Sequence, residues 1–185
     1  DSLSLPAWER ACAAVPPIFA RTVFAGHGPV ALLDAQRAGV PDRVTPLLES
    51  QPNVERVELW QFVRAQTRVA GETDSLADRE LQVRGIPRDT ELFTPELTAG
   101  RGLLPEDDRA LLLNQDIAKD MGVSVGQQIE LDFGDGANRV WTVVGLIYDL
   151  AGQGRTAYLY RDVLARDLGF VGRGSVAEIR LYSNT

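Results

Sequence analysis

The sequence predicts an α+β protein: a lobe of β-α-β units built from both chain ends, with an inserted strand-rich, small barrel-like lobe. One β-α-β pattern occupies residues 30–68 and a second occupies residues 157–182. Between them, a two-residue alternation of apolar and polar side chains marks a hairpin within residues 128–148. We expect a lead-in at residues 1–29, the lobe of both ends at residues 30–84 and 151–185, and the inserted lobe at residues 85–150.

The lead-in carries one helical pattern. Trp8, Cys12 and Val15 recur at helical spacing within residues 5–15, and the adjacent Pro16 and Pro17 must end that helix.

The first β-α-β unit begins with the apolar run 30–33. A helix is expected within residues 41–50, with Thr45 and Pro46 as its N-cap and first-turn pair. After a turn at residues 51–53, residues 54–68 alternate as a half-buried strand, with Val57, Leu59 and Val63 on the inner face and Glu58 and Arg64 on the outer face. The three apolar residues define the expected core face of the strand.

The pattern in the middle of the chain predicts strands joined by turns. The polar residues 71–79 predict a hairpin loop, after which Leu81 and Val83 begin a return strand, and residues 86–105 are irregular. A buried strand at residues 110–113 leads to Asn114, which caps a short helix that Gly122 ends. The hairpin around residues 134–136 follows.

The second β-α-β unit closes the chain. It comprises a strand at residues 157–160, a helix capped by Asp162 that ends at Gly169, and a strand at residues 176–182.

Composition excludes several classes of function. The chain has 185 residues, 44% of them apolar, and its 26 acidic against 19 basic residues give a net charge of −7. That sign disfavours nucleic acid as a partner. Cys12 is the only cysteine and His27 the only histidine, so a disulfide framework, a histidine-rich zinc site and a histidine relay are excluded. No apolar run approaches the ~20 residues of a membrane helix, and a chain that begins at Asp1 is a processed chain or an excised fragment.

Two short motifs suggest catalysis or nucleotide binding, but their context argues against both. Residues 122–126 match the G-x-S-x-G pattern of serine hydrolases around Ser124, yet the expected helix precedes the motif and the strand follows it, the reverse of a nucleophile elbow. Residues 152–157 match G-x-G-x-x-A, yet a strand follows where a dinucleotide site needs a helix N-terminus. We therefore predict no catalytic residue, no cofactor and no metal site.

An ordered series of segments carries a family resemblance. The series comprises residues 99–103 (AGRGL), 112–123 (LLNQDIAKDMGV), 125–131 (VGQQIEL) and 141–146 (WTVVGL). It resembles the MacB-like periplasmic core domain of FtsX-like ABC transporter permeases. The resemblance implies a non-enzymatic extracytoplasmic domain of a cell-membrane protein that binds substrate or partner or relays motion from ATP hydrolysis. It also implies membrane helices on both sides, and the lead-in at residues 1–29 would be the extracytoplasmic continuation of one of them.

The resemblance also implies partners. These are a second permease subunit that completes a dimer, a cytoplasmic ATP-binding subunit or domain, and an extracytoplasmic adaptor or a lipid or peptide substrate. We expect the recognition residues on the loops 71–79 and 149–156, because loops on a rigid scaffold most often carry recognition. The candidates are Asp74, Asp149, Gln153 and Arg155.

Two alternatives remain open from the sequence. A freestanding secreted ligand-binding module predicts a signal peptide upstream and a stop codon soon after Thr185. A small serine hydrolase predicts ester hydrolysis that Ser124→Ala abolishes.

Overall fold

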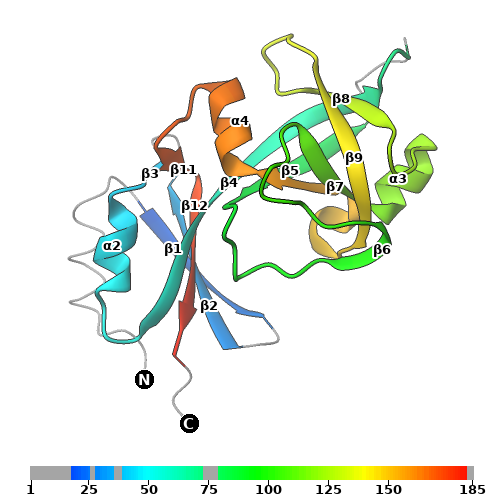
Figure 1. Cartoon of the computed structure of the whole chain (residues 1–185). Coiled ribbons are helices and arrows are strands. Elements are labelled where there is room, and N and C mark those ends of the chain that lie inside the picture. The colour runs from blue at the N-terminus through cyan, green and yellow to red at the C-terminus, as the bar shows by residue number, and fades with distance from the viewer. Residues whose placement is uncertain (1–17, 26–27, 36–38, 73–78, 183–185) are drawn as a thin grey trace.

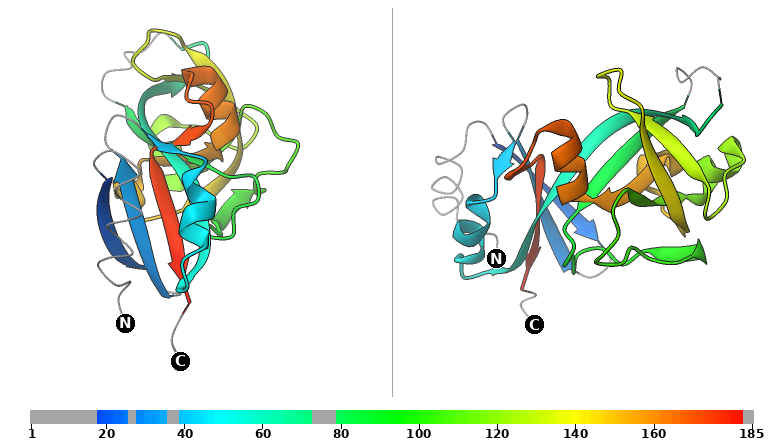
Figure 2. Two further views of the ribbon diagram at one scale, coloured as in Figure 1. Left: turned by 90° about the vertical axis from the view of Figure 1, so that its left-hand side faces the viewer. Right: turned by 45° about the horizontal axis from the view of Figure 1, so that its top comes forward.

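The computed structural model describes residues 18–25, 28–35, 39–72 and 79–182. Two lobes lie side by side and share one long strand, β4 (Val54–Val69), which runs from one lobe into the other (Figures 1 and 2). The predicted helix at residues 5–15 with Trp8, the single His27 and the candidate Asp74 lie outside the described residues. The α+β class is confirmed.

The first lobe is a four-stranded antiparallel sheet with the order β1-β2-β12-β4. One helix, α2, packs against it, and the buried cluster between them comprises Val40, Val44, Leu48, Val54, Val57, Leu59, Ala177 and Ile179. The elements are β1 (Ile18–Ala25), β2 (Gly28–Ala35), β3 (Val40–Pro41), α2 (Val44–Glu49), β11 (Arg173–Gly174) and β12 (Val176–Leu181), with β3 and β11 paired as a separate small ribbon.

Two predictions for this lobe need correction. Residues 18–25 and 28–29, expected to precede the lobe as a lead-in, form part of a β-hairpin that extends its sheet. The helix begins at Val44 with Arg43 at the N-cap position, so Thr45 and Pro46 lie inside its first turn. Pro46 fits there because the first-turn N–H groups need no partner within the helix.

The second lobe is a closed six-stranded barrel. The second half of β4 pairs with β5, followed in order by β10, β7, β9 and β8, and β8 pairs back onto β4. The interior is filled by apolar side chains, among them the fully buried Leu81, Leu111, Ile129 and Trp141. The strands are β5 (Glu80–Ile86), β6 (Glu96–Gly100), β7 (Ala110–Asn114), β8 (Gln128–Asp132), β9 (Arg139–Tyr148) and β10 (Thr156–Tyr160).

The capped helices of the barrel lobe match the sequence signals closely. In α3 (Gln115–Met121), the Asn114 side chain accepts a hydrogen bond from the Asp116 N–H, and Gly122 ends the helix at φ 67°. Gly169 ends α4 (Arg161–Leu168) in the same left-handed conformation. That helix starts one residue before Asp162, with Tyr160 as its N-cap, so the expected Asp162 cap is wrong and its carboxylate lies in the first turn.

The division between the two buried clusters does not follow the expected boundaries. β5, β10 and α4 were expected in the lobe of both ends, yet they contribute Leu81, Leu159 and Leu164 to the barrel core. Pairing explains this, because β10 lies parallel to β5 and antiparallel to β7, which places it inside the barrel. In addition, β6 lies within the stretch expected to be irregular and extends the barrel along β9.

Candidate functional site

The turn between β9 and β10 is held by Asp149. Its carboxylate accepts hydrogen bonds from the Ala151 N–H at 2.8 Å, from the Thr156 hydroxyl at 3.2 Å and from the Tyr158 hydroxyl at 2.6 Å. Burial raises the pKa of Tyr158, so the phenol stays protonated as the donor. Asp149, expected to contact a partner, therefore has its carboxylate engaged inside the turn.

Glycines let this turn fold tightly against its neighbours. A short 3-10 helix, η2 (Ala151–Gly154), has Gly152 and Gln153 in left-handed conformation at φ 58° and 56°. A Cβ at Gly152 would lie 2.8 Å from Thr156 Cγ2, and one at Gly154 would lie 2.9 Å from Asp116 Oδ2. Strand β10 begins directly afterwards. The G-x-G-x-x-A motif is thus a strand-to-strand turn, and no helix N-terminus follows it.

The strand that follows the loop 71–79 and the turn 149–156 contribute to the same surface. β5 starts at Glu80, immediately after the loop 71–79, and β10 runs parallel beside it with Thr156 opposite Gln82. A depression of about 500 Å³ lies between the starts of these strands. Its lining residues are Glu80, Gln82, Leu150, Gly152, Gln153 and Arg155. We call this depression the loop surface.

The turn after β9 contributes three exposed side chains to the loop surface, next to the exposed Glu80 and Gln82 of β5. Gln153 and Arg155 are exposed, and Leu150 is 79% exposed, the highest fraction among the exposed large apolar residues of the described chain. The structure therefore brings Gln153 and Arg155 together on one surface and adds Leu150, which the sequence reasoning missed. An apolar residue in a polar loop next to an expected contact residue was the available signal.

A second cluster, also missed, connects the two lobes. Glu58 on β4 is 2% exposed, although strand alternation placed it on the outer face. Its carboxylate accepts hydrogen bonds from Trp60 Nε1 at 3.0 Å and from the Thr90 hydroxyl at 2.6 Å. The N–H groups of Glu91 and Leu92 donate to its other oxygen at 2.5 and 3.2 Å. The segment 87–93, which we call the clamp segment, covers that face of β4.

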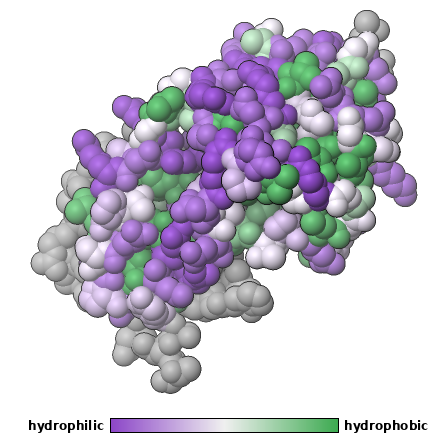
Figure 3. Space-filling model, in the orientation of Figure 1, coloured by the Kyte–Doolittle hydropathy of each residue, from purple (hydrophilic) through white to green (hydrophobic). Residues whose placement is uncertain are grey.

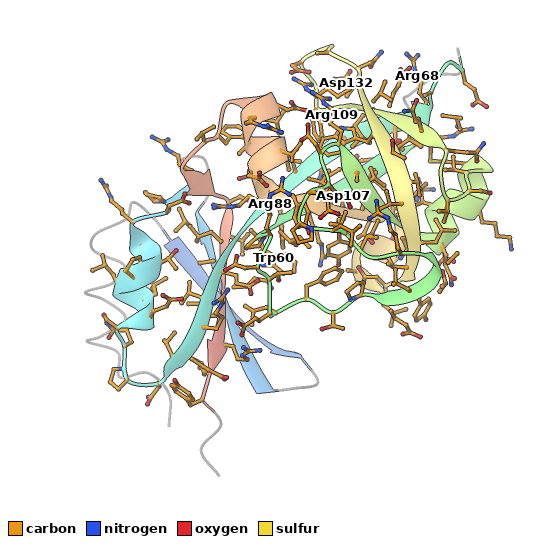
Figure 4. All side chains as sticks on the ribbon, viewed as in Figure 1. Trp60, Arg68, Arg88, Asp107, Arg109 and Asp132 are labelled. Carbon is orange, nitrogen blue, oxygen red and sulfur yellow. The ribbon has the colours of Figure 1, made fainter. Side chains whose placement is uncertain are left out.

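The clamp segment touches both lobes. On the side of the first lobe, Arg56 and Arg180 pair with Asp89 and Glu91, each at 3.0 Å. On the barrel side, the Phe93 ring stacks on Tyr158 at 4.1 Å between ring centroids. Arg88 bonds Asp162 at 3.0 Å and lies over the Tyr160 ring at 4.4 Å. Figure 4 shows Trp60 and Arg88 in the middle of the molecule, and Figure 3 shows this face to be largely hydrophilic there.

The region around Ser124 has the geometry of a helix end and a turn. Gly122 ends α3, Gly126 has φ 88°, and the Ser124 N–H donates to Gln127 Oε1 at 2.7 Å. The helix precedes the motif and β8 follows it, the reverse of the order needed for a nucleophile elbow. The Asp132–Gly136 segment is likewise a turn, because Asp132 Oδ1 accepts hydrogen bonds from the N–H groups of Gly134 and Gly136.

Neither metal binding nor membrane crossing is visible in the described part of the chain. Among those residues, no group of three or more histidine, cysteine, aspartate or glutamate side chains is placed to hold a metal ion. No helix within them is long and apolar enough to span a membrane.

Comparison with known proteins identifies the family. The family model of the MacB-like periplasmic core domain matches residues 16–177, most of the chain. The chain belongs to this family. It is a periplasmic or extracellular domain of a MacB-like ABC transporter permease, as the resemblance implied. No curated protein matches the chain.

Solved structures share the fold at low sequence identity. The periplasmic region of MacB from Actinobacillus actinomycetemcomitans aligns with a TM-score of 0.62 at 13% identity, covering 86% of this chain and 77% of that one. The extracellular domain of the ABC-type transporter YknZ from Gram-positive bacteria aligns with a TM-score of 0.61 at 16% identity, covering 80% and 76%. A domain of a permease protein from Porphyromonas gingivalis gives 0.54 at 18% identity, covering 84% and 75%.

Proposed function

We propose that this MacB-like domain is a non-catalytic coupling element. It carries motion, driven by ATP hydrolysis in a cytoplasmic ATP-binding subunit or domain, from the first lobe to the barrel, and it contacts an extracytoplasmic adaptor or a lipid or peptide substrate through the loop surface. A second permease subunit completes the dimer, and both native flanks lead to membrane helices.

The continuity of β4 is the observation that carries this proposal. The strand has 16 residues, which at about 3.3 Å per residue makes it roughly 50 Å long. Its first part contributes Val54, Val57 and Leu59 to the core of the first lobe, and its second part contributes Ala65 to the barrel core. One strand embedded in two cores transmits a displacement with little bending, because bending would break packing in both cores.

The clamp segment stiffens the same connection. β4 passes from one sheet to the other between Trp60, the last β4 residue paired with β12, and Gln61, the first one paired with β5. Hydrogen bonds to Glu58 and the stacked Phe93 and Tyr158 rings fix this junction from one side. A buried carboxylate with several donors resists opening because separation would leave it unsatisfied.

The loop surface is suited to contact because it combines exposed side chains with a rigid base. Asp149 holds the turn through three hydrogen bonds, so Leu150, Gln153 and Arg155 are presented in fixed positions. Asp149 thus serves as a positioning residue. The role of Asp74, in the loop that leads into Glu80, stays a prediction.

Photo-crosslinking in cells tests the contact. A benzophenone amino acid replaces Leu150 in the full-length transporter, and the matched control replaces Val171, which is 72% exposed but does not line the loop surface. We expect a discrete crosslinked product at position 150, none at position 171, and loss of the product when Arg155→Ala and Gln153→Gly are added. Glycine keeps the left-handed turn. Equal products at both positions, or none at position 150, would contradict the contact.

A further inference from the structure

Arg84 occupies an unusual environment on the outer face of the barrel. It lies on β5, half-buried, and its Nη1 donates a hydrogen bond to the Tyr158 hydroxyl at 3.1 Å. Its guanidinium lies over the rings of Phe62 and Tyr158, at 5.1 and 5.6 Å from their centroids. The aromatic faces and the phenol fix the guanidinium plane without neutralising its charge.

No carboxylate of the described residues lies within 4 Å of Arg84. Five other half-buried arginines of the described chain each pair with a carboxylate, and these are Arg56, Arg68, Arg139, Arg161 and Arg180. Glu178 attracts Arg84 only from a longer distance. None of the Arg84 nitrogen atoms is among the buried atoms that lack a partner, so the donors that Tyr158 does not use remain open to solvent.

Arg84 lines a cavity of about 270 Å³ on this outer face. Phe62, opposite Arg84 on the neighbouring strand, supplies its apolar wall, and Gln82 also lines the neighbouring loop surface. Arg64 lines the cavity too, but its charge is paired with Glu80 at 3.2 Å. The cavity therefore offers one positive charge without a carboxylate partner beside an apolar wall.

We propose that this cavity binds a small amphiphilic carboxylate. The carboxylate would form a bidentate hydrogen-bonded pair with the guanidinium of Arg84, and the apolar part would lie against Phe62. A single unneutralised cation suits a monoanion. A phosphate dianion would bring a second negative charge toward Glu58 and Glu178, which lie on the same face of the sheet. This site adds a small ligand to the coupling role and does not depend on it.

Isothermal titration of decanoate, below its micelle concentration, into the 185-residue chain tests the site. We expect saturable one-to-one binding that Arg84→Gln weakens about tenfold or more, the loss of one charge-assisted contact. The matched control is Arg64→Gln, which lines the same cavity but removes a charge already paired, and it should change the affinity less than about twofold. Decanol, which lacks the charge, should bind at least tenfold more weakly than decanoate.

Four results would overturn the proposal: no saturable binding, equal affinity of decanoate for the chain and for Arg84→Gln, tight binding of decanol, or tighter binding of decyl phosphate than of decanoate. If circular dichroism shows that Arg84→Gln does not fold, Arg84→Lys replaces it as the test variant. Lysine keeps the positive charge but cannot form the bidentate pair, so it should weaken binding several-fold. Binding is read on this chain alone, so failure here leaves the crosslinking test of the loop surface unaffected.

Discussion

Glu178 lies directly opposite Glu58 where β12 pairs with β4. The two carboxyl groups differ in their partners, because Glu58 accepts four hydrogen bonds, whereas none is found for Glu178 within the described chain. Burial raises the pKa of Glu178 to about 7; Arg84 opposes the shift, and Glu58 adds to it. Glu178 is therefore the acidic residue whose ionisation near neutral pH costs the fold free energy.

The sign of the resulting pH dependence follows from that raised pKa. Between the ordinary value of 4.5 and about 7, the folded state binds more protons at Glu178 than the unfolded state does. Its contribution to stability therefore falls as the pH rises through this window, and the full cost persists above it. We expect Glu178→Gln to raise the free energy of unfolding by about 1–2 kcal/mol at pH 8 and to have little effect at pH 5.

Thermal melting at the two pH values measures this difference. A gain of that size corresponds to roughly 2–8 °C at pH 8 for a chain of this length. Glu96→Gln, on the exposed strand β6, serves as the control and should shift melting equally at both pH values. A Glu178→Gln gain that is the same at pH 5 and pH 8 would show that ionisation of Glu178 is not its source.

Individual residues also show which structural roles could be predicted from the sequence. Asn114 and Gly122 were predictable as helix caps because capping is local chemistry, and both predictions are confirmed. The inner role of Asp149 was not predictable, because its donors Thr156 and Tyr158 become neighbours only when β10 returns beside the turn. Glu58 was misplaced for a related reason: alternation along a strand separates two faces but does not reveal a segment that covers the second one.

At the scale of elements, regular alternation was the dependable signal. β8 and β9 were both expected from alternation, and they pair as the predicted hairpin. β6 was not predicted because all five of its residues are exposed, so no apolar alternation marks it. β5 and β10 were each expected as strands, but their parallel pairing joins residues more than 70 positions apart and leaves no local trace.

The clamp segment yields a prediction at this scale. Glu58→Gln replaces an acceptor of four hydrogen bonds by a group with one oxygen and an N–H₂ that faces donors. We expect it to lower the free energy of unfolding by about 2–4 kcal/mol. Urea unfolding of the 185-residue chain measures the loss.

The matched control uses the same change in the same segment. Glu91 has a side chain that is 58% exposed and pairs with Arg180 at the surface, so Glu91→Gln should cost less than about 1 kcal/mol. Similar losses for the two variants would mean that the buried hydrogen bonds of Glu58 do not hold the clamp segment.

At the scale of the whole molecule, the sequence was sufficient for the α+β class, the barrel-like second lobe and the family. It was not sufficient to predict which strands belong to which lobe. The pattern of β4 predicts one half-buried strand and does not show that its two halves pack in different cores. The expected boundaries at residues 84/85 and 150/151 followed chain order, whereas packing groups β5, β10 and α4 with the barrel core.

If the proposed coupling role is right, the domain moves as one stiff body between the ATP-bound and nucleotide-free states of the hydrolysis cycle. Pulsed electron spin resonance on the full-length dimer measures this directly, with Cys12 replaced by serine and spin labels at Gln153 in the barrel and at Glu49 on α2, both exposed positions. Doubly labelled subunits diluted with unlabelled ones report the distance within one domain. Labels at position 153 alone report the distance between the two subunits.

We expect ATP, trapped by a hydrolysis-deficient ATP-binding subunit, to shift the distance between subunits by several ångströms and to leave the distance within one domain unchanged. A changed distance between positions 49 and 153 would show that β4 and the clamp segment do not hold the lobes together. An unchanged distance between subunits would show that the domain does not relay motion.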